Sequence, residues 1–207
     1  MMKIYDIEGF PNPARIRIAL AEKGIIDQVE FIPVDVLGGE HRQPEFLAKN
    51  PNAAVPVLEL DCGTCISECT AITAYIDHTY AGISLTGTSA QERAIIHMMQ
   101  RRAESNVLDA IVAYFHHATD GLGPDIEIYQ NQCWGEKQKE KALDGLGYFN
   151  RVLETMSYVA GDNFSVADIT LYAGVNFTNF IKVPIPQEYT HLQAWFDRVS
   201  KRASIAG

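Results

Sequence analysis

The chain has 207 residues, 47% of them hydrophobic and 21% charged, an ordinary composition for a folded protein with one core or two small ones. Its formal net charge of −9 argues against a nucleic-acid partner, because proteins that bind nucleic acids present basic surfaces to the phosphates. We see neither a signal peptide nor a run of about 20 apolar residues, so the expected protein is cytoplasmic and makes no membrane contact.

The first 80 residues are predicted to alternate between strands and helices. Asn12 and Pro13 suit the N-cap and first position of a helix, and Gly24 suits its end. The expected order is strand, helix, strand, short helix, hairpin and helix, over residues 3–7, 12–24, 30–34, 44–49, 57–67 and 68–80.

The stretch around Pro56 predicts a peptide-binding site. Pro56 precedes a short alternating strand, and an X-Pro bond is the one place where a cis peptide is cheap. A cis Val55–Pro56 bond would turn the N–H and C=O of Val55 away from the sheet, leaving both for another peptide backbone. Glu68 and Cys69 then open a helix, whose free N–H groups favour a carboxylate. The predicted ligand is a small peptide with a free carboxylate and a free amine.

These residues resemble the glutathione-binding signature of the glutathione S-transferases: Val55-Pro56-Val57-Leu58, then Ile66-Ser67-Glu68-Cys69-Thr70-Ala71-Ile72. The resemblance implies that Val55 pairs with the cysteinyl backbone of glutathione and that residues 68 and 69 hold its γ-glutamyl group. Cys69 stands where the family has Ser and is a weaker side-chain donor, but its backbone N–H remains, so we expect binding to survive.

The resemblance also implies the fold class, α/β plus all-α. A thioredoxin-like glutathione-binding domain is expected over residues 1–80, a linker over 81–88, and an all-α domain with the electrophile pocket over 89–207.

The first helix determines the chemistry, because N–H groups at a helix start lower the pKa of a thiol. Arg15 to Gly24 resembles this helix in bacterial, theta-like and zeta-like members, and the catalytic serine of zeta-type enzymes then falls on Phe10, which has no hydroxyl. Asn12 is the remaining candidate: its amide could donate to the thiolate, or it could only cap the helix. Tyr5 is the other hydroxyl nearby, but its register relative to the first helix is off by one residue. Its side chain is therefore expected on the opposite face of the strand, away from the thiol.

His41 and Arg42 are candidates for binding the glycine end of glutathione. In theta-like members a His in a similar Gly-x-His-basic stretch contacts the glycine carboxylate, and His41 matches it with Arg42 adding charge. The alternative for this pair is a solvated surface loop.

Four cysteines lie at positions 62, 65, 69 and 133, and Cys62-Gly63-Thr64-Cys65 is formally a C-x-x-C. A redox C-x-x-C of a thioredoxin-like domain belongs at the start of the first helix, whereas this one lies in the predicted hairpin turn. No second pair or nearby His completes a zinc set, so we interpret both cysteines as turn residues and expect no metal.

The rest of the chain is predicted to be helical. Ser89 to Glu92 is a capping box that starts a helix reaching about His117, and a second helix is expected over residues 131–156. Gly145 and Gly147 inside that helix are interpreted as sites of close packing. Ser165 and Asp168 resemble the family's Ser-x-x-Asp capping motif and are expected to be structural, and the last helix is expected over residues 193–202. Arg101, Arg102, His116 and His117 are interpreted as packing or solvated residues.

The predicted function is glutathione S-transferase activity, in which enzyme-bound glutathione thiolate attacks a small electrophile. Glutathione is the co-substrate, and the resemblance implies a homodimer. Two alternatives stay open because of Phe10: a glutathione-dependent oxidoreductase acting on disulfides or peroxides, and a non-catalytic glutathione-binding protein.

Overall fold

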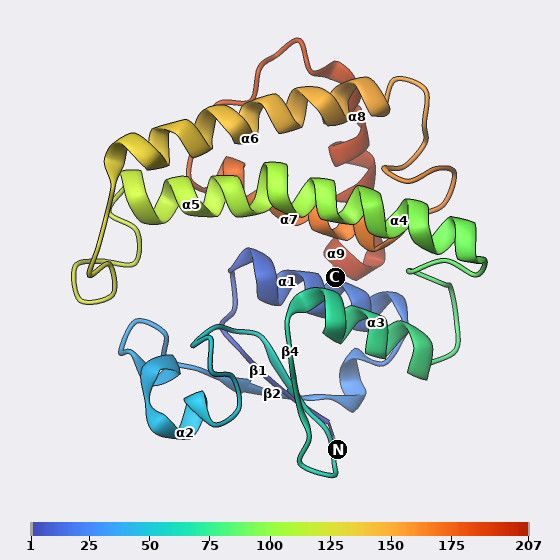
Figure 1. Ribbon diagram of the computed structural model, residues 1–207. Coiled ribbons are helices and arrows are strands. Elements are labelled where there is room, and N and C mark those ends of the chain that lie inside the picture. Colours follow the sequence, from blue (N-terminus) through green and yellow to red (C-terminus); the bar gives the residue numbers. More distant parts are fainter. Residues whose placement is uncertain (1, 207) are drawn as a thin grey trace. The chain divides into compact units, whose positions relative to one another are not determined.

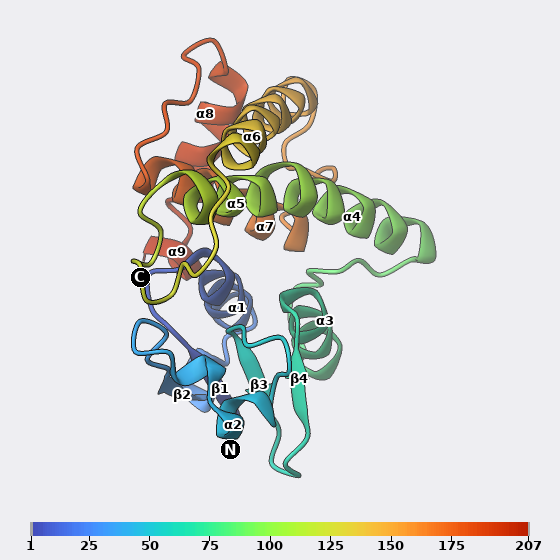
Figure 2. The same cartoon turned by 60° about the vertical axis from the view of Figure 1, so that its left-hand side comes forward.

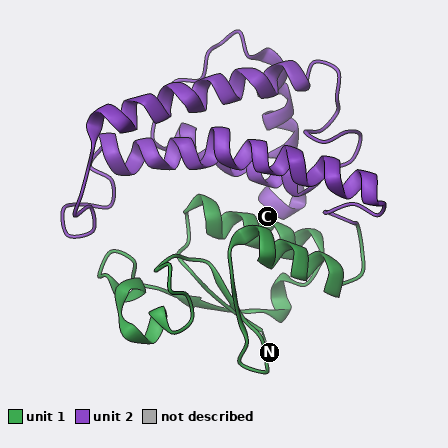
Figure 3. Ribbon diagram, viewed as in Figure 1, with its two compact units in different colours: residues 1–83 green, residues 84–207 purple. Residues whose placement is uncertain are grey.

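A computed structural model describes residues 2–206, which form two compact units, residues 1–83 and 84–207 (Figure 3). The first unit contains β1 (Lys3–Asp6), α1 (Pro11–Glu22), η1 (Ile26–Gln28), β2 (Glu30–Pro33), η2 (Glu40–Arg42), α2 (Pro44–Leu47), β3 (Val57–Glu59), β4 (Cys65–Ser67) and α3 (Cys69–Thr79) (Figure 1). The second contains α4 (Ala90–Ala103), the π-helical η3 (Glu104–Leu108), α5 (Asp109–Ala118), α6 (Gln132–Val152), α7 (Val166–Phe180), α8 (Thr190–Val199) and α9 (Ala203–Ala206). The predicted fold class, α/β plus all-α, is confirmed.

The sheet of the first unit has the order β2-β1-β3-β4, with β1 and β2 parallel and the other neighbours antiparallel. Side chains alternate along β1, so that Ile4 and Asp6 are buried while Tyr5 is only partly buried. In two views α1 and α3 lie together and α2 lies apart from them (Figures 1 and 2).

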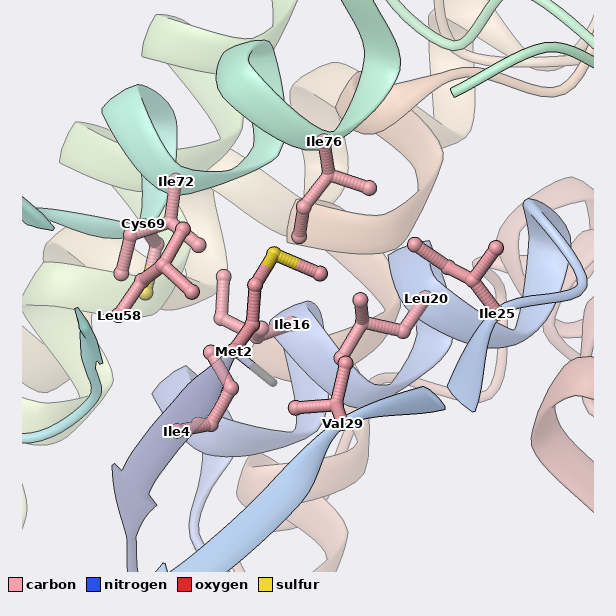
Figure 4. Close-up of a cluster of buried hydrophobic side chains, with 10 residues drawn as sticks. All are labelled: Met2, Ile4, Ile16, Leu20, Ile25, Val29, Leu58, Cys69, Ile72 and Ile76. Carbon is pink, nitrogen blue, oxygen red and sulfur yellow. The ribbon is translucent and has the colours of Figure 1, made fainter. Parts of the chain in front are cut away.

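The core of this unit lies between α1, α3 and the strands. Its members are apolar side chains from both helices, the strands and the turn after α1, and they converge in Figure 4: Met2, Ile4, Ile16, Leu20, Ile25, Val29, Leu58, Cys69, Ile72 and Ile76. This shared core fixes the starts of α1 and α3 relative to β3, which is what positions the candidate site.

Two ion pairs strengthen the packing of α1. Arg17 donates two hydrogen bonds to Asp6 of β1, at 2.9 and 3.2 Å. Lys23, at the end of α1, is bonded to the Asp77 carboxylate of α3 at 3.0 Å, and both side chains are 2% exposed. Lys23 also donates to the backbone oxygen of Ile83 at 2.9 Å, so residues 81–83 of the predicted linker are held by the first unit.

The second unit is built from long helices packed through small residues. A Cβ on Gly145 of α6 would lie 2.6 Å from the backbone oxygen of Asn106, and one on Gly147 would lie 2.7 Å from the Tyr189 hydroxyl oxygen. Both glycines therefore permit close approach, as predicted. None of the helices in residues 2–206 is both long and apolar enough for a membrane span.

The start of α7 is fixed by Asp168, which is fully buried. Its two carboxylate oxygens accept four hydrogen bonds, from the backbone N–H groups of Val159 and Ser165, the Ser165 hydroxyl and the indole N–H of Trp195, at 2.9 to 3.1 Å. Burial raises the pKa of Asp168 to about 6, against the opposing effect of these hydrogen bonds. The structural role predicted for this motif is confirmed by the capping box it forms.

Some predicted boundaries were wrong. The N-cap of α1 is Phe10, with an extended backbone and no side-chain cap, because Pro11 occupies the first helical position and the Ala14 N–H bonds to the Phe10 oxygen at 3.1 Å. Asn12 therefore lies inside the first turn and is not its cap. In the second unit, α6 ends at Val152, before the predicted Met156, and α8 begins at Thr190, before the predicted Gln193.

Candidate functional site

The bond between Val55 and Pro56 is cis, as the sequence predicts, and it directly precedes β3. Pro56 is buried and Val55 is half-buried. The pairing of Val57 with Ser67 brings the residue after this proline beside the end of β4, and Glu68 follows there as the N-cap of α3. The two halves of the predicted motif are therefore neighbours in space.

Glu68 has a positive φ of 69° and a ψ of 120°, outside the regions that L-residues favour. This geometry exposes its side chain at the start of α3, where Asn52 donates to its carboxylate at 3.2 Å. Strained residues of this kind cluster at ligand sites, because the surrounding fold must hold them in place.

Cys69 is placed differently from its neighbour Glu68, whose side chain is exposed. Its side chain is 7% exposed and belongs to the apolar core, and its thiol is directed at the backbone oxygen of Asn12, 3.5 Å away. The thiol is thus occupied inside the fold and is not a side-chain donor for a ligand. The same contact joins the start of α3 to the start of α1.

The start of α1 therefore lies against this cluster. Phe10 is half-buried and brings no hydroxyl. Asn12 is also half-buried, and its side-chain oxygen accepts a hydrogen bond from Arg15 at 3.1 Å. The structure thus brings together Val55, Glu68, Cys69 and Asn12.

His41 lies in η2 and is 7% exposed, so it is not the solvated loop residue of the alternative interpretation, whereas Arg42 is exposed. The Nδ1 atom of His41 is buried with no hydrogen-bond partner among the described residues. Burial, and secondarily the charge of Arg42, lower the pKa of His41. At neutral pH the imidazole is therefore uncharged and can offer an N–H donor but no positive charge.

Tyr5 lies outside the cluster. Its hydroxyl donates to the Glu59 carboxylate at 2.8 Å, and the Lys49 ammonium, bonded to the same oxygen at 2.6 Å, lies over its ring. Tyr5 lines a cavity of about 280 Å³ beside α2, together with Glu40, Gln43, Glu45, Phe46 and Lys49. A thiol at the start of α1 would not be activated by this hydroxyl.

The C-x-x-C lies in the turn between β3 and β4, and none of the cysteines, all of which are in the described part of the chain, forms a disulfide. The Sγ of Cys62 lies 3.2 Å from the Thr64 hydroxyl oxygen, and hydrogen bonds that the Thr64 hydroxyl and backbone N–H donate to the thiolate lower the pKa of Cys62. Within residues 2–206, no group of three or more His, Cys, Asp or Glu side chains is arranged to hold a metal ion.

Two positioning residues were missed by the sequence analysis. Asn50 is 2% exposed and stabilises the turn before the cis bond, donating to the Ala54 oxygen at 2.7 Å and accepting from the Asn52 N–H at 3.1 Å. Asn52 in turn holds Glu68. Asn-Pro-Asn is a recognised turn sequence, so the turn could have been predicted, but its contact with residue 68 could not.

Comparison with known proteins shows the family of the chain. Residues 1–78 match the family described as "Glutathione S-transferase, N-terminal domain", and residues 103–203 match its C-terminal domain. Glutathione S-transferase 2 of Saccharomyces cerevisiae is 52% identical over 204 residues, covering 99% of this chain and 88% of the relative. The chain belongs to the glutathione S-transferase family.

Two solved structures of family members superpose closely on this chain. A glutathione S-transferase domain-containing protein of Marinobacter aquaeolei is 60% identical with a TM-score of 0.97, covering 98% of this chain and 99% of that one. Gtt2 of Saccharomyces cerevisiae is 52% identical with a TM-score of 0.97, covering 99% of this chain and 98% of its own. This glutathione S-transferase therefore shares its whole fold, and not one domain alone, with the family.

Proposed function

We propose that this chain is a glutathione S-transferase that conjugates the glutathione thiolate to small electrophiles. The observation that carries the proposal is the meeting of the cis Val55–Pro56 bond, the start of α3 and the start of α1. Glutathione presents a peptide backbone, a carboxylate and a thiol, and each needs a different partner. The residue before Pro56 offers backbone groups to the peptide, the start of α3 offers N–H groups to the carboxylate, and the start of α1 offers a donor to the thiol.

In this proposal the backbone of Val55, next to Pro56, pairs with the cysteinyl residue of glutathione. The backbone N–H groups at the start of α3, including that of Cys69, bind the γ-glutamyl carboxylate, and the Glu68 carboxylate binds its amine. His41 donates an N–H to the glycine carboxylate while Arg42 supplies positive charge nearby. The unpartnered Nδ1 of His41 supports this role, because buried polar atoms normally have partners.

The thiol is placed at the start of α1, where the Asn12 amide stands in for the hydroxyl that Phe10 lacks. An N–H donor stabilises the thiolate, so the thiol loses its proton to solvent closer to neutral pH. The thiolate then attacks the electrophilic atom and forms the carbon–sulfur bond, while the displaced electron pair leaves with the leaving group or stays on the acceptor. The names of the relatives do not favour the oxidoreductase and non-catalytic alternatives.

We also propose a cytoplasmic homodimer with a role in detoxification. In each chain the glutathione-binding domain spans residues 1–80, the linker spans 81–88, and the helical domain over 89–207 supplies the electrophile pocket. The family resemblance supports these assignments.

The test is a pH titration of the ultraviolet thiolate absorbance of bound glutathione. Asn12→Ala should raise the pKa of the bound thiol by about one unit, because a donor to the anion is lost. Turnover with a model aryl halide below that pKa should fall by about tenfold, since one pKa unit corresponds to a tenfold change in thiolate fraction.

Glu68→Ala provides the complementary result. It should weaken glutathione binding by about tenfold or more through loss of a charge-assisted contact, while the pKa of the thiol, once bound, stays at the wild-type value. A wild-type protein that binds glutathione with the thiol pKa of free glutathione would contradict the transferase mechanism.

A further inference from the structure

The first turn of α1 is unusually poor in backbone donors. Pro11 and Pro13 have no N–H, and the N–H of Ala14 is bonded to the Phe10 oxygen at 3.1 Å. The four N–H positions that a helix leaves without an intrahelical partner are here Phe10 to Pro13; both prolines lack the group, so Asn12 is the one residue inside the helix among them that keeps it. Inside the first turn, Asn12 can therefore supply a thiolate with a backbone donor as well as a side-chain donor.

Arg15 lies one turn further along α1, and its side chain is directed back towards the helix start, as helical side chains generally are. It is 2% exposed, and its Nη1 donates to the Oδ1 of Asn12 at 3.1 Å. A guanidinium held in the interior has little freedom to turn away, so this contact constrains the amide.

The contact also determines which end of the amide faces the ligand. Arginine has five N–H donors and no acceptor, so only the oxygen of the Asn12 amide can face Arg15. The Nδ2 group, with its two N–H donors, must then be directed away from Arg15, and in residues 2–206 no hydrogen-bond acceptor is recorded for it. Without Arg15, the amide could rotate and present its oxygen, which would repel a thiolate.

We propose that Arg15 is a positioning residue for thiol activation: by binding the Asn12 oxygen, it holds the amide with its N–H donors facing the glutathione sulfur. The inference rests on the proposed function of Asn12 and adds a residue that touches neither glutathione nor the electrophile. Arg15 acts through Asn12, so its effect on the thiol depends on the amide being present.

The test is a double-mutant cycle on the pKa of bound glutathione. Arg15→Met keeps an unbranched side chain of similar volume but removes the donors. It should raise the thiol pKa by about half a unit or more in the wild-type background and leave it unchanged in the Asn12→Ala background. Arg15→Lys keeps one donor group and should give a pKa between those of the wild type and Arg15→Met.

Arg17→Met is the matched control, because Arg17 lies on the same helix but bonds to Asp6. It should lower thermal stability without moving the thiol pKa. If Arg15→Met does not fold, the same cycle with Arg15→Lys decides. Equal shifts in both backgrounds, or no shift in either, would overturn the positioning role. If the pKa of the wild-type complex is already unshifted, the proposed function fails instead, so the two failures are distinguishable.

Discussion

Asp168→Ala is expected to lower the free energy of unfolding by about 4 kcal/mol or more. The substitution leaves the N–H groups of Val159, Ser165 and Trp195 without their carboxylate acceptor in a fully buried position. Each buried donor that loses its partner costs about 1 to 3 kcal/mol. The measurement is chemical denaturation of the purified protein, supported by the thermal midpoint, which should fall by about 10 °C.

Asp162→Ala is the control, since Asp162 is an exposed carboxylate in the turn just before α7. Its effect should stay within about 0.5 kcal/mol. Asp168→Asn retains one oxygen acceptor but turns an NH₂ group towards N–H donors. Its free energy of unfolding should therefore lie between those of Asp168→Ala and Asp162→Ala. A midpoint for Asp168→Ala equal to that of Asp162→Ala would show that the four hydrogen bonds contribute little.

Lys23→Met is expected to destabilise the protein by about 3 to 5 kcal/mol, because it strips the ammonium from a carboxylate that is itself buried. Lys23 contacts the Asp77 carboxylate and two backbone oxygens, those of Asp77 and Ile83, at 2.9 to 3.3 Å. Replacing both partners with apolar residues, as in Lys23→Met with Asp77→Leu, should recover part of the loss, because neither position then carries an unpaired buried charge. Urea unfolding of the wild type, Lys23→Met and the double variant measures these differences in the free energy of unfolding.

Lys137→Met serves as the comparison, because Lys137 pairs with Glu140 at 2.7 Å on the exposed face of α6. Exposed pairs contribute little to stability because solvent screens their charges, so this variant should unfold close to the wild type. If the double substitution at positions 23 and 77 were less stable than Lys23→Met alone, uncompensated charge would not be the cause of the destabilisation.

The glutathione motif was predictable because its information is local. The cis proline, the strand that follows it and the helix opening at Glu68 and Cys69 lie within 15 residues, and turn and strand rules place them without knowledge of distant contacts. The position of Tyr5 on the opposite side of the strand from the core also followed from simple alternation.

What could not be predicted depends on contacts between distant segments or on a choice between equal local signals. Pro11 and Pro13 both suit the first position of a helix, and the sequence does not determine which is used, so the N-cap was wrongly placed on Asn12. The burial of His41, and the contact of the Cys69 thiol with the Asn12 oxygen, depend on how separate elements pack.

The π-helical turn η3, between α4 and α5, was also not foreseen, because a repeat of apolar residues predicts a long helix but does not reveal one widened turn. Such a turn holds one residue more than an α-helical turn, and each residue rotates a helix by about 100°. Deleting Ser105 would therefore leave the residue count of an α-helical turn, so the widened turn would close into regular α-helix and α5 would keep its rotation relative to α4. The loss would fall on the local approach of the Asn106 backbone to Gly145. The extra residue thus acts as a spacer at the crossing of η3 and α6, and its removal should cost packing at Gly145 rather than the continuity of the helix.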